Sequence, residues 1–156
     1  MMHVKNILVP VDFSEYSKVA LRYGLELARK LDAAVTVLHI NWIPAAYVGL
    51  DVMMPTLPEG GQTIQDYTHA QAQEHLAALV DEVAKPDGPV IHREVRAGDA
   101  AKGIIDRAGE DDVDMIVMGT HGRSGLDHWL IGSIAEKVVR SAPCPVLTVR
   151  YHPKAE

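Results

Sequence analysis

The sequence of 156 residues contains only one cysteine, Cys144, which excludes an internal disulfide. Cys144 lies between Pro143 and Pro145, and a thiol in this setting is more often a small buried apolar group than a nucleophile. Long apolar runs are also absent near the start of the chain, where residues 1–6 precede only five consecutive apolar residues. Such a run is too short for a signal peptide core or a membrane span, so we expect a cytoplasmic protein with no membrane partner.

Positive charge is scarce as well. Lys and Arg number 15 against 21 Asp and Glu, which gives a formal net charge of -6 at pH 7. The chain therefore has no general basic field that would attract nucleic acid or an anionic lipid surface. Hydrophobic residues make up 47% and charged residues 23%, which is ordinary for a globular protein. We expect one domain over residues 1–156 that binds no nucleic acid.

Apolar strings alternate with helical patterns along the whole chain. Continuous apolar or β-branched stretches predict strands at 7–11, 35–40, 90–95, 113–118 and 146–149. Apolar residues at helical spacing predict four helices. Two of them begin after the candidate caps Ser14 and Asp99, and the other two cover about 65–84 and 133–142. Because parallel strands need crossover helices, the alternation predicts an α/β fold, a doubly wound five-stranded parallel sheet with helices on both faces.

Two parts of this pattern stand out. The strand predicted at 90–95 is the most polar, which favours a position at the edge of the sheet. The segment 43–61 contains Pro and Gly residues that exclude a regular helix over most of its length, yet it is unusually apolar for a loop. Two interpretations of this segment stay open, a lid or subunit contact on one hand and a floppy connector on the other.

A glycine-rich segment follows the fourth predicted strand. Gly119, Gly122 and Gly125 permit positive φ and let backbone N–H groups approach an anion closely. Gly132 and Ser133 fall at the start of a helix, where unpaired N–H groups and the helix dipole attract negative charge. The segment therefore predicts a phosphate-binding site.

A purely structural interpretation competes with this one. The glycines would only turn the chain, and Ser133 with Glu136 would form a capping box that occupies the same N–H donors. The segment also matches neither GxxxxGK[ST] nor GxGxxG, which disfavours a P-loop ATPase. With no lysine in the loop, no evident base for water and no catalytic triad spacing, fast hydrolysis is not expected and no catalytic residue is predicted.

The spacing of the glycines carries a resemblance. Gly119 and Gly122 enclose two residues, Gly122 and Gly132 enclose nine, and Ser133 follows directly. This Gly-x2-Gly-x9-Gly-Ser pattern resembles the ATP-binding motif of the universal stress protein family. Three short strings in the same order support the likeness, which spans about residues 4–150; they are 7–14, 117–122 and 143–147. The resemblance implies a Rossmann-like sheet of the adenine nucleotide alpha hydrolase type.

The resemblance also implies an ATP site built from distant parts of the chain. Asp12 would lie near the ribose or the phosphates, where a carboxylate accepts ribose hydroxyls or holds Mg²⁺. Ile40 would lie beside adenine and offer an apolar wall. The other implied contacts are Pro10, Met118, Gly119, Gly122, Gly132, Ser133 and Ile134. The alternative role of Asp12 is that of a helix-capping carboxylate.

Two further loop residues carry a charge or ring suited to phosphate, Arg123 and His121. Exposed loop charges are usually solvated, so two interpretations of Arg123 are equally supported: its side chain binds phosphate, or it is only solvated. His121 is the weaker candidate for a phosphate contact. His121 with Asp127 and His128 lacks a convincing metal-ligand spacing.

The resemblance implies regulation rather than catalysis. The bound nucleotide would bias conformation or assembly, and the last strand, within 145–150, would pair across a two-fold axis in a homodimer. Three functions stay open: an ATP-binding regulatory stress-response dimer, a slow ATPase or self-phosphorylating protein, and an interaction module without nucleotide. The intact glycine set counts against the third.

Overall fold

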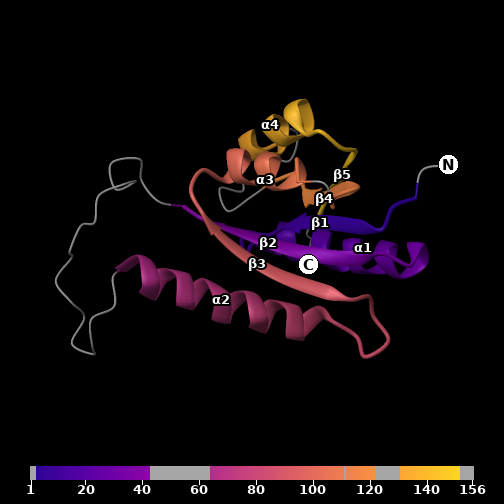
Figure 1. Ribbon diagram of the computed structural model, residues 1–156, viewed down its shortest axis with the longest axis horizontal. Helices are drawn as coiled ribbons and strands as arrows, with labels where there is room; N and C mark the ends of the chain where they lie inside the picture. Colours follow the sequence, from indigo (N-terminus) through magenta and orange to yellow (C-terminus); the bar gives the residue numbers. More distant parts are fainter. Residues whose placement is uncertain (1–2, 43–63, 111, 122–130, 152–156) are drawn as a thin grey trace, which may run out of the picture.

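The computed structural model describes residues 3–42, 64–110, 112–121 and 131–151 (Figure 1). Its strands are β1 (Asn6–Pro10), β2 (Ala34–Asn41), β3 (Ile91–Ala97), β4 (Met115–Gly119) and β5 (Val146–Val149). Its helices are α1 (Glu15–Leu31), α2 (Ile64–Val83), α3 (Ala100–Ala108) and α4 (Ser133–Ser141). The strands form one sheet in the order β3-β2-β1-β4-β5.

The expected doubly wound parallel sheet is confirmed. β1 pairs in parallel with β2 along its whole length, from Asn6 opposite Ala34 to Pro10 opposite Leu38, and its other edge pairs with β4. The polar strand β3 lies at one edge of the sheet, as predicted, and β5 lies at the other. The chain therefore winds outward from β1 in both directions, and the winding reverses between β1 and β4.

One strand begins later than the apolar pattern predicts. The prediction of 113–118 is wrong at its start, because β4 begins only at Met115. Asp114 directs its carboxylate to the beginning of β1 instead, where Oδ2 accepts hydrogen bonds from the backbone N–H groups of Lys5 (2.8 Å) and Asn6 (2.9 Å). This contact joins residues more than 100 positions apart, so no local pattern signals it.

Helices cover both faces of the sheet, which explains why the strands read as continuous apolar strings. Alternate strand residues such as Ile7 and Val9 pack against α1 and α2, whereas Leu8 and Ile116 pack against α3 and α4. Figure 1 shows α3 and α4 above the sheet and α2 below it. Within the described ranges, no helix is long and apolar enough to cross a bilayer.

Both predicted helix caps form as expected. The Ser14 hydroxyl oxygen accepts a hydrogen bond from the backbone N–H of Ser17 at 3.2 Å and so caps α1. Asp99 caps α3, since its Oδ1 accepts from the backbone N–H of Lys102 at 2.8 Å. Each bond satisfies a donor that would otherwise have no partner within the helix.

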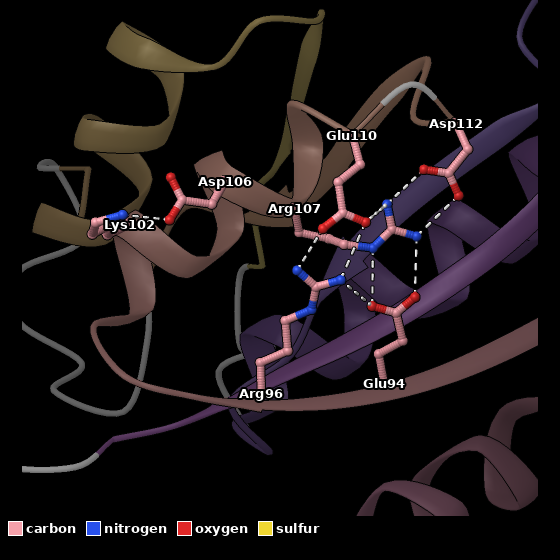
Figure 2. Close-up of polar contacts among 7 residues, drawn as sticks. All are labelled: Glu94, Arg96, Lys102, Asp106, Arg107, Glu110 and Asp112. Carbon is pink, nitrogen blue, oxygen red and sulfur yellow. Dashed lines mark hydrogen bonds and ion pairs between the residues drawn. The ribbon is translucent and has the colours of Figure 1, made fainter. Parts of the chain in front are cut away.

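A network of ion pairs ties the β3 edge to α3 (Figure 2). The Arg107 side chain is only 4% exposed, and its guanidinium donates two hydrogen bonds to Glu94 on β3 (2.9 and 3.0 Å) and two to Asp112 (2.7 and 3.0 Å). Beside it, Arg96 contacts Glu110 at 2.7 Å. These hydrogen bonds raise the pKa of Arg107 and lower the pKa values of Asp112 and Glu110. The network therefore fixes the end of α3 on the sheet as fully charged pairs.

We expect Arg107→Ala to lower the free energy of unfolding by about 2 kcal/mol, less than the roughly 3–5 kcal/mol of a fully buried pair because both carboxylates reach solvent. Urea denaturation measures the change. The matched control is Lys102→Ala, which removes an exposed pair with Asp106 on the same helix and should cost no more than about 0.5 kcal/mol. Equal losses in the two variants would show that the network does not stabilise the fold.

Candidate functional site

The carboxyl ends of β1, β2 and β4 lie side by side at one end of the strands, which we call the carboxyl edge of the sheet, around the point where the winding reverses. Ligands of open α/β sheets bind at this position. Pro10 ends β1, Ile40 is the next-to-last residue of β2, and Met118 and Gly119 end β4. The fold therefore brings to one edge four of the residues singled out from distant parts of the sequence.

Asp12 begins a tight turn between β1 and α1. Its Oδ1 accepts hydrogen bonds from the backbone N–H (3.0 Å) and the hydroxyl (2.5 Å) of Ser14, and its own N–H donates to Ser17 Oγ (3.3 Å). Between them, Phe13 has a φ of 65°, a strained conformation for a bulky residue. The alternative role expected for Asp12, as the cap of α1, is therefore wrong, because Ser14 is the cap residue. Asp12 orients Ser14 instead.

A cavity of about 670 Å³ opens beside this turn, between α1 and α2. Across it, Lys18 of α1 contacts Glu82 of α2 at 2.6 Å. The Phe13 ring lies against the ring of His39 (centroids 4.4 Å apart) and meets His75 edge-on (5.8 Å). Of the predicted site residues that the structure describes, Asp12 alone lines this cavity. The cavity therefore lies next to the carboxyl end of β1, on the face of the sheet that α1 and α2 cover.

Ile40 and Met118 are buried in the core beneath α3 and α4. Ile40 is 9% exposed. A Cβ placed on Gly103 of α3 would lie 2.8 Å from Ile40 Cδ1, so this glycine lets α3 pack closely onto the end of β2. Ile40 therefore presents only a small exposed surface at the end of β2, and its predicted place beside adenine stays a prediction.

The two ends of the glycine-rich segment are joined by backbone hydrogen bonds. Thr120 directly follows β4; its N–H donates to Val149 of β5 (3.2 Å), and its carbonyl oxygen accepts from the N–H of Gly132 (2.7 Å). We call this pair of bonds at Thr120 the neck. It holds the start of α4 beside the end of β4, which is the geometry that a phosphate site on this helix requires.

The capping box expected from the structural alternative does not form. Gly132 is the N-cap of α4 and makes no side-chain cap bond, while Ser133 is already the first helical residue. The Glu136 carboxylate contacts Arg140 instead, at 2.6 Å. Among the residues that the structure describes, no side chain caps the first N–H groups of α4, and Ser133 and Ile134 are exposed.

Comparison with known proteins decides the family. The model of the universal stress protein family matches residues 3–150 of this chain.

The chain belongs to the universal stress protein family.

Individual relatives agree with the family model. Universal stress protein MJ0531 of Methanocaldococcus jannaschii is 35% identical over 153 residues, covering 97% of this chain and 85% of the relative. The solved structure of UspA from Lactobacillus plantarum superimposes with a TM-score of 0.73 at 25% identity, covering 95% of this chain and 99% of the other. A universal stress protein from Archaeoglobus fulgidus in complex with dAMP gives a TM-score of 0.61 at 25% identity, covering 95% and 98%.

Part of the predicted site of this universal stress protein lies outside the described residues. This applies to Gly122 and Arg123, whose predicted roles stay predictions. The segment 43–61, predicted as a lid or subunit contact or as a connector, lies outside the described residues as well. In the part of the chain that the structure describes, no group of three or more His, Cys, Asp or Glu residues could hold a metal ion. Mg²⁺ bound with a nucleotide needs only one or two carboxylates in addition to the phosphates, and Asp12 fits that requirement.

Sequence reasoning missed the part that Thr120 and Tyr16 play. Thr120 forms the neck, and a Cβ placed on Gly119 would lie 3.1 Å from the backbone carbonyl carbon and oxygen of Tyr16. The close packing of β4 against the first turn of α1 therefore favours glycine at position 119, whatever its role toward a ligand. Nothing in the local sequence signals either contact, because both join elements far apart in the chain.

We expect Gly119→Ala to lower the free energy of unfolding by about 1–2 kcal/mol, because the added methyl group presses on rigid backbone. The matched control is Gly103→Ala, where the methyl group meets the flexible end of Ile40 and the helix gains up to about 1 kcal/mol of propensity. Urea denaturation of both variants should show a clear loss for Gly119→Ala and little change for Gly103→Ala. The reverse order would contradict the packing role of Gly119.

Proposed function

We propose that this protein is a cytoplasmic ATP-binding regulator of the stress response, which works as a homodimer and whose nucleotide state biases its conformation or assembly. The observation that carries the proposal is the start of α4. Within the described ranges its first N–H groups have no side-chain cap, and the neck holds them beside the carboxyl end of β4. N–H groups in this arrangement bind phosphate, and the helix dipole adds to the attraction.

The adenine part of the proposal is supported by a relative. The Archaeoglobus fulgidus protein shares the fold at 25% identity, and its structure holds dAMP. The present chain has the full glycine spacing of the family's ATP motif, from Gly119 to Ser133. A triphosphate is our extension of this similarity, because the longer anion would use the additional donors at the start of α4.

Each residue of the proposed site has a distinct role. Gly119 and Gly122 would approach the α-phosphate side, while Ser133 and Ile134 would offer backbone N–H groups to the outer phosphates and Gly132, whose own N–H is bonded to Thr120, would let those phosphates come close. The remaining members are Pro10, Ile40 and Met118 around adenine and ribose, Asp12 on the ribose hydroxyls or on Mg²⁺, and Arg123 as a phosphate partner. Mg²⁺ would offset phosphate charge that the backbone donors leave unbalanced.

The two edges of the sheet differ in a way that supports dimerisation through β5. β3 carries His92, Arg93, Glu94 and Arg96, and charged residues on an edge strand discourage pairing with another chain. β5 reads Val-Leu-Thr-Val and has no charged residue. An uncharged edge strand can pair with the same strand of a second copy across a two-fold axis, which is the commonest symmetry of homodimers.

ATP binding can be tested on protein purified without added nucleotide. We expect denaturation to release an adenine nucleotide, and calorimetry of the emptied protein to show ATP binding that Gly122→Val weakens at least about tenfold, because a branched side chain blocks close approach of the backbone. Gly109→Ala, at the far end of α3, is the control. Folded protein that releases no nucleotide and does not bind ATP would refute the proposal.

Turnover of radioactive ATP by the same variants tests the enzymatic alternative. Hydrolysis or self-labelling that disappears in Gly122→Val would favour a slow ATPase or self-phosphorylating protein at this site. Turnover that this substitution leaves unchanged cannot come from the site, and absence of turnover leaves the regulatory proposal.

The β5 interface can be tested without disturbing the sheet. Pro145 and Val149 direct their carbonyl groups to β4, so the alternate residue Thr148 directs its N–H to the free edge. We expect Thr148→Pro to shift the dimer toward monomer, because proline removes that donor. Arg93→Pro makes the same change on the outer side of β3, since Val90 bonds to β2, and should leave the dimer intact. Analytical ultracentrifugation distinguishes the two outcomes; a dimeric Thr148→Pro would exclude the β5 interface.

A further inference from the structure

His121 is held in a fixed orientation at the neck. It directly follows Thr120, and its Nδ1 lies 2.9 Å from the Thr120 hydroxyl oxygen. Its ring packs against the ring of Tyr16 on α1, with centroids 5.4 Å apart, and Tyr151 meets Tyr16 edge-on at 5.6 Å. Contacts from α1 and from Thr120 therefore fix the imidazole where the glycine-rich segment begins.

The second ring nitrogen of His121 has no partner. Nε2 is buried, and it is the one buried side-chain nitrogen or oxygen in the described ranges that makes no hydrogen bond. Buried polar atoms in native proteins are almost always hydrogen-bonded, and an unsatisfied one calls for a functional explanation such as a ligand that completes it. The fixed ring and the unsatisfied atom together point to a group that Nε2 is built to meet.

The surroundings of His121 favour an anion as that group. The Thr120 carbonyl is bonded to Gly132, so the peptide that leads into His121 is joined to the uncapped start of α4. The Thr120 hydroxyl can donate to Nδ1, and this arrangement leaves the proton of the neutral imidazole on Nε2. A phosphate oxygen can only accept at such a contact, and an Nε2–H group supplies the donor it needs.

We propose that His121 is a phosphate-binding residue of the nucleotide site, whose Nε2–H donates a hydrogen bond to a phosphate oxygen of the bound adenine nucleotide. The inference rests on the proposed function and adds a side-chain donor to a site otherwise built from backbone N–H groups. It makes His121 a determinant of specificity, since the protein then distinguishes phosphorylated nucleotides from the nucleoside.

The test compares adenosine, AMP and ATP on wild-type protein and on His121→Asn. Asparagine keeps a polar group near the position of Nδ1, and so the contact with Thr120, but does not reach the position of Nε2. We expect calorimetry to show affinity for AMP and ATP about 10- to 100-fold lower in the variant, the range for a hydrogen bond to a charged group, with adenosine affinity changed less than about twofold. His121→Gln, which reaches the Nε2 position, should retain most of the affinity for ATP.

A measurement on unmodified protein removes any dependence on how the variants fold. With ¹⁵N-labelled histidine, we expect the NMR signal of His121 Nε2 to shift when AMP or ATP is added and to stay in place with adenosine. For the calorimetric comparison, the control variant is His92→Asn, which replaces an exposed histidine on the edge strand β3. This variant should bind adenosine, AMP and ATP as the wild type does.

The outcomes separate this inference from the proposed function. Wild-type protein that binds ATP, combined with equal losses for adenosine and ATP in His121→Asn, would show a structural role and overturn the inference alone. An unchanged affinity, or an Nε2 signal that adenosine shifts as much as ATP does, would overturn it as well. Wild-type protein that binds neither ATP nor AMP would refute both.

Discussion

Backbone hydrogen bonds on both edges of β1, to β2 on one side and to β4 on the other, hold together every part of the candidate site. Because all three strands are parallel, their carboxyl ends come to the same edge, and so Asp12, Ile40 and Gly119 approach one another despite their distance in the sequence. The helices on both faces shield these bonds from water. The arrangement of the site thus depends on strand pairing, in which its own residues Pro10, Ile40 and Gly119 take part.

The neck at Thr120 then determines what that edge can bind. Its bond to Gly132 sets the uncapped start of α4 beside β4, and its neighbours Gly119 and His121 are fixed by contacts with Tyr16. The same few residues therefore serve packing and binding at once. This overlap explains why glycine at 119 cannot be assigned to ligand binding from its residue type alone, since the close approach to α1 already favours it.

The periphery of the sheet is asymmetric, and the asymmetry has a physical consequence. On the β3 side, Arg107 and its carboxylate partners stabilise the end of α3 and leave a charged edge that resists pairing (Figure 2). On the β5 side the edge is short and uncharged. Of the two edge strands, β5 is therefore the one that is better suited to pair with another strand.

The sequence by itself determined the local structure and the family: the caps Ser14 and Asp99, the alternation of strands and helices, and the glycine spacing all depend on residues a few positions apart. Only the tertiary structure decided the start of β4, the unformed capping box at Ser133, the burial of Ile40 and the neck. These features arise from contacts between segments that are distant in sequence. Propensity and spacing report the preferences of one segment, whereas packing and long-range hydrogen bonds depend on which segments the sheet brings together.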